Sequence, residues 1–289
     1  MHRSLASRLV KLTLGALALI SLSACESATA RADAEARDRW TRSFPAAPGL
    51  QLKLVNTNGA IHAEASDGAS LELVAERSAN AATDAKARAL LADTEMREDV
   101  DGQRVRVEVI SPATLGGADI EVSWTVRVPK GVSVDLETAN GRIALAGLSD
   151  GVRAETVNGA IVGVALTTGR VSAETVNGAI ELELATPPAD DGRIALESVN
   201  GAVSLALPAE SRASVSAEVV NGAIDAHELA LEMTDESSRT ELVGTLNGGG
   251  ARVTLETVNG AARITRSRAA EGSAPAPARE PERGEAAGA

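Results

Sequence analysis

The sequence predicts an all-β fold, a parallel β-solenoid (β-helix) whose coils are about 20 residues long. The first observation is an Asn-Gly pair that, from Asn140 onward, returns after 18, 19, 23 and 21 residues. The second is the alternation of apolar and polar residues on both sides of these pairs. The third is the scarcity of aromatic residues, which make up 1% of the chain. A core of Val, Ile, Leu and Ala suits a thin coil better than a sandwich about 10 Å thick.

The Asn-Gly pairs are predicted to be structural turns that join short strands. Across residues 171–184, apolar and polar residues alternate before and after the pair, so each half reads as a strand with one buried face. Asn and Gly both tolerate positive φ, which a tight corner often requires. An eighth pair, Asn247-Gly248, continues into two further glycines and departs from the pattern. The predicted turns are Asn58-Gly59, Asn140-Gly141, Asn158-Gly159, Asn177-Gly178, Asn200-Gly201, Asn221-Gly222 and Asn259-Gly260.

Alternation alone also fits an antiparallel arrangement, either a hairpin meander or a sandwich. In a two-residue hairpin, the strands that flank each Asn-Gly pair would bond to each other. The columns of the repeat favour the parallel coil, because Thr or Ser stands two positions before most of these Asn residues and Ile or Val stands three positions after. Parallel strands in register place like on like, and they let Asn and Thr side chains form ladders along the stack.

Residues 1–24 are predicted to be a lipoprotein signal peptide. A basic start precedes an apolar run at 12–22, which is too short to span a bilayer because a span needs about 20 residues. The run ends in Leu22-Ser23-Ala24-Cys25, which resembles the bacterial lipobox, and Cys25 is the chain's single cysteine. The resemblance implies cleavage before Cys25 and lipid attachment to it; an ordinary signal peptide with an incidental cysteine is the alternative. Glu26, in place of Asp, favours the outer membrane by the same resemblance.

The charge of the chain bears on its partners. Cleavage before Cys25 would remove three basic residues and no acidic one, which changes the formal net charge from −12 to −15. A domain this acidic should not bind nucleic acid, because the phosphate backbone attracts basic surfaces. The single cysteine also excludes a disulfide within the chain.

Composition divides the rest of the chain into a tether, a folded domain and a tail. Residues 25–40, mostly Ala, Arg, Asp and Glu, are predicted to be a tether, and 41–265 the β-solenoid domain. Within this domain, 60–128 is expected to cap the start of the solenoid, with a short helix at 81–92, and 131–265 to form the repeat array. Residues 266–289 lack an apolar pattern and are expected to be disordered.

A column of glutamates stands three positions before most of the turn asparagines. Stacked carboxylates could form a ridge that binds divalent cations or a basic partner, because carboxylate oxygens suit Ca²⁺. The alternative is a solvated face that keeps the sheet soluble and discourages sideways pairing. The candidate ridge consists of Glu137, Glu155, Glu174, Glu197, Glu218 and Glu256.

The sequence offers no catalytic constellation. After the signal peptide the histidines are His62 and His227, which are far apart and have no Cys or His at metal-ligand spacing. No Gly-x-Ser-x-Gly elbow, Ser/His/Asp set or phosphate-binding loop stands out. We therefore predict no catalytic residues, no bound metal and no cofactor.

Three features resemble the bacterial putative-adhesin family of unknown function, also called the toastrack domain. They are the segment Leu-Val-Asn-Thr-Asn-Gly-Ala-Ile at 54–61, the segment Val-Arg-Val-Pro-Lys at 126–130, and the Asn-Gly array. The resemblance covers roughly residues 41–265. It implies a β-solenoid on the cell envelope and brings no catalytic residues with it.

Taken together, these features predict a non-enzymatic, lipid-anchored protein of the cell envelope, held by its anchor in the outer membrane rather than the inner one. The solenoid would act as a scaffold or an adhesin-like surface and gain affinity by repetition. Its partners would be the membrane, through the lipid, and an envelope protein or glycan. A partner protein in envelope sensing is one alternative, and a polysaccharide-active β-helix enzyme is another.

Overall fold

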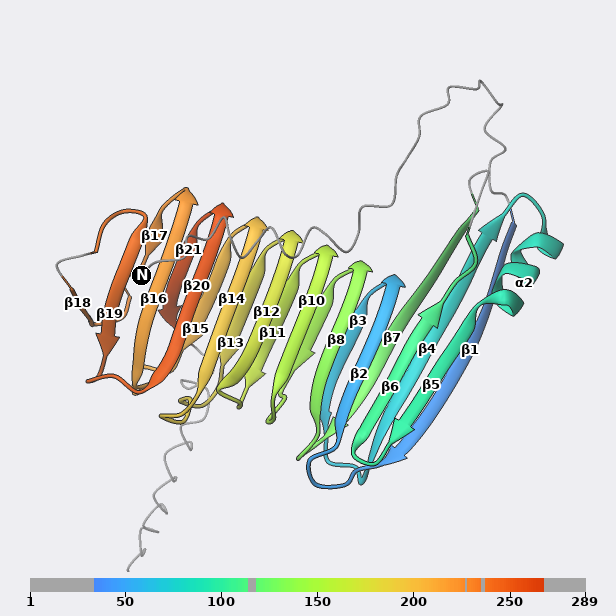
Figure 1. The fold of residues 1–289 in the computed structure, drawn as a ribbon, viewed down its shortest axis with the longest axis horizontal. Helices are drawn as coiled ribbons and strands as arrows, with labels where there is room; N and C mark the ends of the chain where they lie inside the picture. Colours follow the sequence, from blue (N-terminus) through green and yellow to red (C-terminus); the bar gives the residue numbers. More distant parts are fainter. Residues whose placement is uncertain (1–33, 114–117, 227, 235–236, 268–289) are drawn as a thin grey trace, which may run out of the picture.

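A computed structural model describes residues 34–113, 118–226, 228–234 and 237–267, which form two large mixed β-sheets (Figure 1). The ten-stranded sheet contains, in spatial order, β1 (Ala34–Pro45), β4 (Ser70–Ala81), β7 (Asp119–Pro129), β3 (Ile61–Ser66), β9 (Ile143–Ala146), β11 (Ile161–Leu166), β13 (Ile180–Leu184), β15 (Val203–Leu207), β21 (Ala262–Arg266) and β17 (Ile224–Asp225). The eleven-stranded sheet contains β18 (Leu231–Met233), β19 (Glu241–Leu246), β16 (Ala213–Asn221), β20 (Ala251–Asn259), β14 (Arg193–Asn200), β12 (Arg170–Asn177), β10 (Val152–Asn158), β8 (Ser133–Asn140), β2 (Gln51–Asn58), β6 (Arg104–Ile110) and β5 (Glu95–Asp101).

The predicted all-β fold with parallel strands is confirmed through the middle of both sheets. The strands on either side of each of the seven predicted turns lie in different sheets, so these Asn-Gly pairs do not close hairpins. Instead, each strand pairs in parallel with its counterpart from another repeat, as where Ala154 lies beside Ala173 and Ile161 beside Ile180. Antiparallel pairing occurs towards both ends of the stack. At the N-terminal end, β4 pairs with β1 and β7, and β5 pairs with β6. At the C-terminal end, β19 pairs with β16 and β18.

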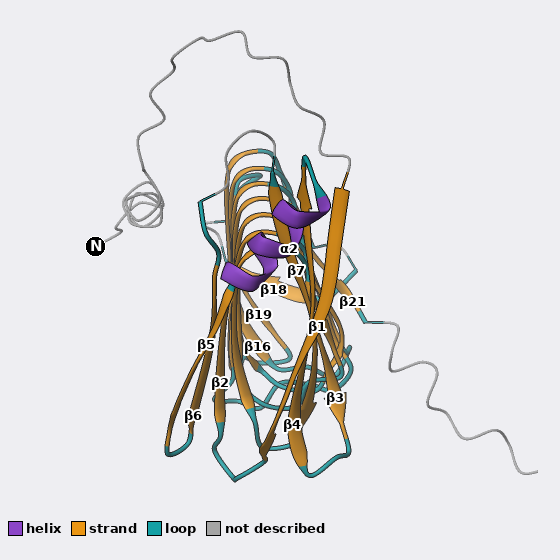
Figure 2. Ribbon diagram, turned by 90° about the vertical axis from the view of Figure 1, so that its right-hand side faces the viewer, coloured by secondary structure: helices purple, strands orange, loops and turns teal. Residues whose placement is uncertain are grey.

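The core between the sheets is built from aliphatic side chains. The alternating pattern turns one face of each strand inward, and Leu136, Ile161 and Leu196 are completely buried there. Figure 2 looks along the stack and shows the two sheets facing each other as separate layers. The low aromatic content is thus matched by a core of medium-sized side chains packed between two close layers.

The last Asn-Gly pair does not follow the chain order. The strands β20 and β21 insert between β14 and β16 in one sheet, and between β15 and β17 in the other. Asn259 therefore stacks between Asn200 and Asn221, although Asn221 precedes it in sequence. The Gly-rich stretch after Asn247 makes this crossing: Asn247 and Gly248 have φ of 50° and 80°, and Ala251 N–H donates to Arg212 O (3.1 Å). The order of the strands in space therefore differs from their order in the sequence at this end of the stack.

The glycines at the corners are required by close packing more than by positive φ. The asparagines of the seven turns do not have positive φ, and among their glycines only Gly59 does, at 119°. A Cβ added at Gly178 would instead lie 1.9 Å from Gly159 O on the neighbouring repeat. The backbones touch at the corner, which only glycine permits. The predicted positive φ is therefore found at Gly59 alone among these seven glycines.

The N-terminal end contains the aromatic residues and the helix. Trp40 packs edge-on against Trp124, with ring centroids 5.7 Å apart. The predicted helix is confirmed as α2 (Asp84–Asp93), which starts after Thr83, whose hydroxyl accepts a hydrogen bond from Lys86 N–H. This helix lies at the end of the gap between the sheets (Figure 2).

The predicted tether at 25–40 is wrong over residues 34–40. These residues belong to β1, which pairs along its whole length with β4. The sequence does not reveal this strand because it is a charged edge strand, and the residues that pack against the core, Ala36, Trp40 and Phe44, stand four positions apart. The predicted tail at 266–289 is wrong at its first residue, because Arg266 is the last residue of β21. The predicted signal peptide, Cys25 and residues 268–289 of the tail lie outside the described residues.

Candidate functional site

The turn asparagines form a continuous ladder along one edge of the stack. Each side-chain amide donates from Nδ2 to Oδ1 of the next asparagine, at 2.8–2.9 Å, so the predicted ladder is confirmed. At one end, Asn58 Nδ2 lies 3.4 Å from Ile120 O of β7. The order along the ladder is Asn58, Asn140, Asn158, Asn177, Asn200, Asn259 and Asn221.

A second ladder lies just inside the first. The Thr and Ser residues two positions before the asparagines are almost fully buried, and their hydroxyls donate to glycine carbonyls of the neighbouring repeat. Thr175 Oγ1, for example, lies 3.0 Å from Gly159 O. These bonds satisfy buried hydroxyls that would otherwise be costly. They also tie each corner to the next.

The predicted glutamates do lie in one column on the outer face of the eleven-stranded sheet. The strand register places them side by side in the order Glu137, Glu155, Glu174, Glu197, Glu256 and Glu218. Neighbouring strands are about 4.8 Å apart, so the carboxylates are close enough to repel one another.

Basic side chains reduce this repulsion at one end of the column. Lys53 Nζ pairs with Asp135 (2.9 Å) and with Glu137. Arg153 lies between strands, pairing with Glu155 and reaching Glu174 at 3.3 Å. Burial lowers the pKa of Lys53, but its hydrogen bonds to the two carboxylates outweigh burial and raise it.

Glu155 is a partly buried carboxylate of this column. Burial raises the pKa of Glu155, and the nearby charge of Arg153 offsets this only in part. Within the described residues, no three His, Cys, Asp or Glu side chains converge so that they could hold a metal ion. The ion pairs with Lys53 and Arg153 make this part of the column a partly neutralised stripe.

The sequence interpretation missed a column of arginines on the same face. The register places Arg170, Arg193 and Arg252 side by side on β12, β14 and β20. Each stands seven positions before a turn asparagine, so aligning the repeats on Asn-Gly would have revealed the column. Arg170 pairs with Asp191 at 2.7 Å, whereas the side chains of Arg193 and Arg252 make no hydrogen bond or ion pair within the described part of the chain.

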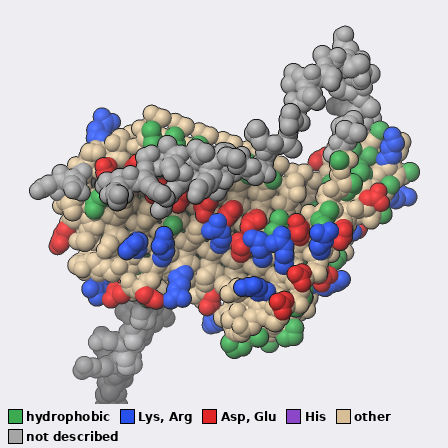
Figure 3. Space-filling view, in the orientation of Figure 1, with side chains coloured by type: hydrophobic (Ala, Val, Ile, Leu, Met, Phe, Trp, Pro, Cys, Tyr) green, Lys and Arg blue, Asp and Glu red, His purple; other side chains and the backbone are tan. Residues whose placement is uncertain are grey.

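A shallow trough of about 700 Å³ runs along this face beside the arginines. Its floor is low because small residues, including Gly151, Ser172 and Ala195, separate the longer charged side chains. Figure 3 shows basic and acidic side chains alternating in a band across the middle of this side of the molecule. The arrangement can make many similar ion pairs and hydrogen bonds with an extended ligand.

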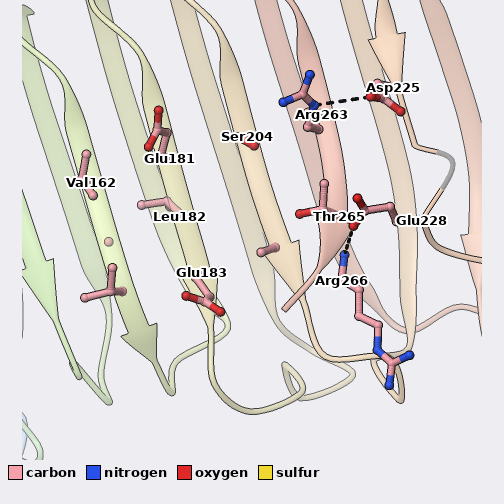
Figure 4. Close-up of a pocket in the computed structure, with 13 residues that line it drawn as sticks. Val162, Glu181, Leu182, Glu183, Ser204, Asp225, Glu228, Arg263, Thr265 and Arg266 are labelled. Atoms are coloured by element: carbon pink, nitrogen blue, oxygen red, sulfur yellow. Dashed lines mark hydrogen bonds and ion pairs between the residues drawn. The ribbon is translucent and has the colours of Figure 1, made fainter. Parts of the chain in front are cut away.

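The opposite sheet also has a depression, of about 610 Å³ (Figure 4). Its floor includes Ser204, and Glu181 stands on one side. On the other side, Arg263 pairs with Asp225 at 3.4 Å. Part of the lining is irregular because β11 departs from regular register, with Ala165 at φ 52°.

The other predicted residues contribute little to either face. His62 lies on β3 with Nε2 3.7 Å from Glu64 Oε2, and His227 lies outside the described residues. Cys25, the predicted lipidation site, also lies outside them. In the part of the chain that the structure describes, no helix has the length and apolar character needed to cross a membrane.

Comparison with known proteins gives remote likenesses. No protein-family model matches the chain, and no curated protein sequence matches it. Among solved structures, it is similar to a putative cell adhesion protein from Clostridium sporogenes, with 12% identity and a TM-score of 0.49 over 79% of this chain and 100% of the other. It is also similar to a putative adhesin from Bacteroides fragilis (11% identity, TM-score 0.35, 79% and 97% covered). A third similar structure is a putative lipid binding protein from Parabacteroides distasonis, with 11% identity and a TM-score of 0.24 over 78% of this chain and 96% of the other. Likenesses this remote do not decide the function.

Proposed function

We propose that this chain is a non-enzymatic, lipid-anchored protein of the cell envelope. Its stacked strands would form a β-solenoid that presents a repeated binding surface to an extended envelope polymer. One observation carries the proposal: the outer face of the eleven-stranded sheet repeats an arginine, a small or polar residue and a glutamate on three adjacent strands, β12, β14 and β20.

Repetition is what gives such a surface useful affinity. A single exposed ion pair contributes only about 0–1 kcal/mol, so one arginine would hold a ligand weakly. A polymer that meets several strands at once makes its later contacts intramolecular, which raises the overall affinity without any new type of contact. The trough beside Arg170 and Arg193 leaves room for such a chain to lie across the strands.

The lipid anchor is proposed from the sequence around Cys25. Its test is to compare the wild-type protein with Cys25→Ser for incorporation of a labelled fatty acid and for partition into a detergent phase. Both should be lost in the variant while the protein is still made. Equal labelling of the two proteins would overturn the anchor without affecting the proposed surface.

The binding surface is tested with polymers of known length. Isolated cell-wall sacculi and extracted envelope polysaccharide are offered intact and after shortening to oligomers. The triple variant Arg170→Ser, Arg193→Ser and Arg252→Ser should bind the long forms about tenfold more weakly. The variant Arg37→Ser, Arg39→Ser and Arg97→Ser makes the same charge change on β1 and β5, at the far end of the molecule, and should bind like the wild type.

Three results would contradict the proposal. Equal binding of the two triple variants would show that the arginine column is not the contact. Equal affinity for oligomer and polymer would exclude multivalent binding. Shortening of the polysaccharide during incubation would make the protein an enzyme.

A further inference from the structure

We infer that Asn221-Gly222 is a site of spontaneous covalent modification, at which Asn221 deamidates while the other turn asparagines are protected. In this reaction, the backbone nitrogen of the glycine attacks Cγ of the preceding asparagine. The bond between Cγ and the side-chain nitrogen breaks, ammonia leaves, and a cyclic imide forms. Water then opens the imide to aspartate or isoaspartate, so no oxidant or enzyme is needed. Asparagine is a thermolabile residue, and a following glycine offers no Cβ to obstruct the attack.

The reaction needs a free glycine N–H and a side-chain amide that can turn towards it. Six of the seven turns meet neither need, because the backbone N–H of each glycine donates to an asparagine carbonyl of the adjacent repeat. These bonds are 2.8–3.1 Å long and involve Gly59, Gly141, Gly159, Gly178, Gly201 and Gly260. Their asparagine side chains are held as well, since in the ladder each both donates from Nδ2 and accepts at Oδ1.

Asn221 differs because it is the end of a ladder that has a direction. Its Nδ2 donates to Asn259 Oδ1 (2.9 Å), but within the described residues its own Oδ1 accepts nothing. For Gly222 N–H, no acceptor occurs there either. Exposure does not explain the difference, because Asn158, Asn177 and Asn221 are all exposed.

The cause is the topology of the C-terminal end. Because β20 inserts inside β16, the strand that ends in Asn221 becomes the last parallel strand of its sheet. Its outer neighbour, β19, runs antiparallel and brings no Asn-Gly corner beside Asn221. The hydrogen bonds from Val219 N–H to Thr240 O and from Ile224 N–H to Arg239 O pass on either side of the corner and leave it open.

The eighth pair is an internal comparison. Asn247 Nδ2, the group that must leave, donates to both Ala209 O (3.0 Å) and Ser211 O (2.8 Å). Asn221 Nδ2 has a single acceptor, the side chain of Asn259. We therefore expect Asn221 to react before Asn247.

Deamidation would change the end of the stack. Aspartate adds a negative charge to an already acidic protein and removes the amide donor to Asn259. Isoaspartate also reroutes the backbone through the side chain at a corner where Gly222 packs against Gly260 O. The modification would therefore loosen β16 and β17 slowly with the age of the molecule.

The test is incubation of the folded, full mature chain in mildly alkaline buffer, followed by peptide mass spectrometry that resolves all eight Asn-Gly pairs. Asn221 should lose its amide at least about tenfold faster than any ladder asparagine, and the rates should converge when the same chain is unfolded in urea. An Asn221→Ser variant should lack the fast signal, and Asn221→Asp should reproduce the lowered thermal stability of the aged protein. Faster reaction at any other pair, or an Asn221 that stays intact while the unfolded chain reacts, would overturn the inference.

Discussion

The strands in the middle of the stack and those at its N-terminal end are stabilised by different residues. In the middle, from β8 to β15, each strand lies beside strands of nearly the same sequence, and the same small set of side chains recurs in columns. At the N-terminal end, β1 pairs antiparallel with β4 in one sheet, and β5 pairs antiparallel with β6 in the other. Trp40, Trp124 and α2 fill the space between the sheets there.

The difference shows what a repeating stack needs and what ends it. A middle strand is stabilised by its neighbours, which continue both ladders and the core. An end strand has a neighbour on one side only, so its contacts must come from elsewhere. Large aromatics supply apolar area, and Arg42 on β1 pairs with Glu98 on β5 (2.7 Å), which joins the two edge strands across the end of the core. Charges on β1 also oppose pairing with a further strand.

The largest effect is expected from removing the aromatic bulk of the N-terminal end. Trp124 is 2% exposed, so Trp124→Ala should lower the free energy of unfolding by about 3–5 kcal/mol, as measured by urea denaturation. Its Nε1 makes no hydrogen bond within the described residues. Trp124→Phe keeps an aromatic ring in the core and should therefore lose less stability than Trp124→Ala. Equal losses in the two variants would show that a single aromatic ring does not fill the space that Trp124 occupies.

The next effect distinguishes the corners of the middle from an ordinary turn. Gly178→Ala would place a Cβ 1.9 Å from a backbone oxygen and should cost about 3 kcal/mol or more in the same assay. Gly102, in the hairpin between β5 and β6, is the matched control, because it has φ +58° and no atom near its added Cβ. Gly102→Ala should cost about 1–2 kcal/mol, from left-handed strain alone. Equal costs would show that backbone conformation, and not close packing, selects glycine at the corners.

The smallest effect concerns charge in the middle of the stack. Burial raises the pKa of Glu155 in the folded state, so the folded protein holds this proton more readily than the unfolded chain. This carboxyl therefore favours folding most below the ordinary glutamate pKa of about 4.3, and the advantage is lost as pH rises through the raised pKa.

Glu155→Gln should accordingly raise the melting temperature at neutral pH, and the gain should vanish in acid. The corresponding increase in the free energy of unfolding should be less than about 1 kcal/mol. Glu218→Gln, at the exposed end of the column, is the control and should change little at either pH. A loss of stability in Glu155→Gln at neutral pH would show that the pairing with Arg153 outweighs burial.

The sequence was informative wherever neighbours repeat. The asparagine ladder, the Thr and Ser column and the glutamate column followed from counting positions relative to Asn-Gly, because strands in register convert equal spacing into contact. The same counting would have revealed Arg170, Arg193 and Arg252. It could not have shown the trough beside them, which depends on where small residues such as Gly151 and Ala195 meet across strands.

By itself, the sequence determined the β class, the parallel middle, the helix near 84–93 and the residues that stack, since all of these depend on local pattern and spacing. Only the tertiary structure decided the order of the last strands, the strand at 34–40 and the difference between Asn221 and its six counterparts. Each of these is a matter of which segment lies beside which at an end of the stack. Spacing along the chain cannot specify that, because an end strand is defined by the neighbour that it lacks.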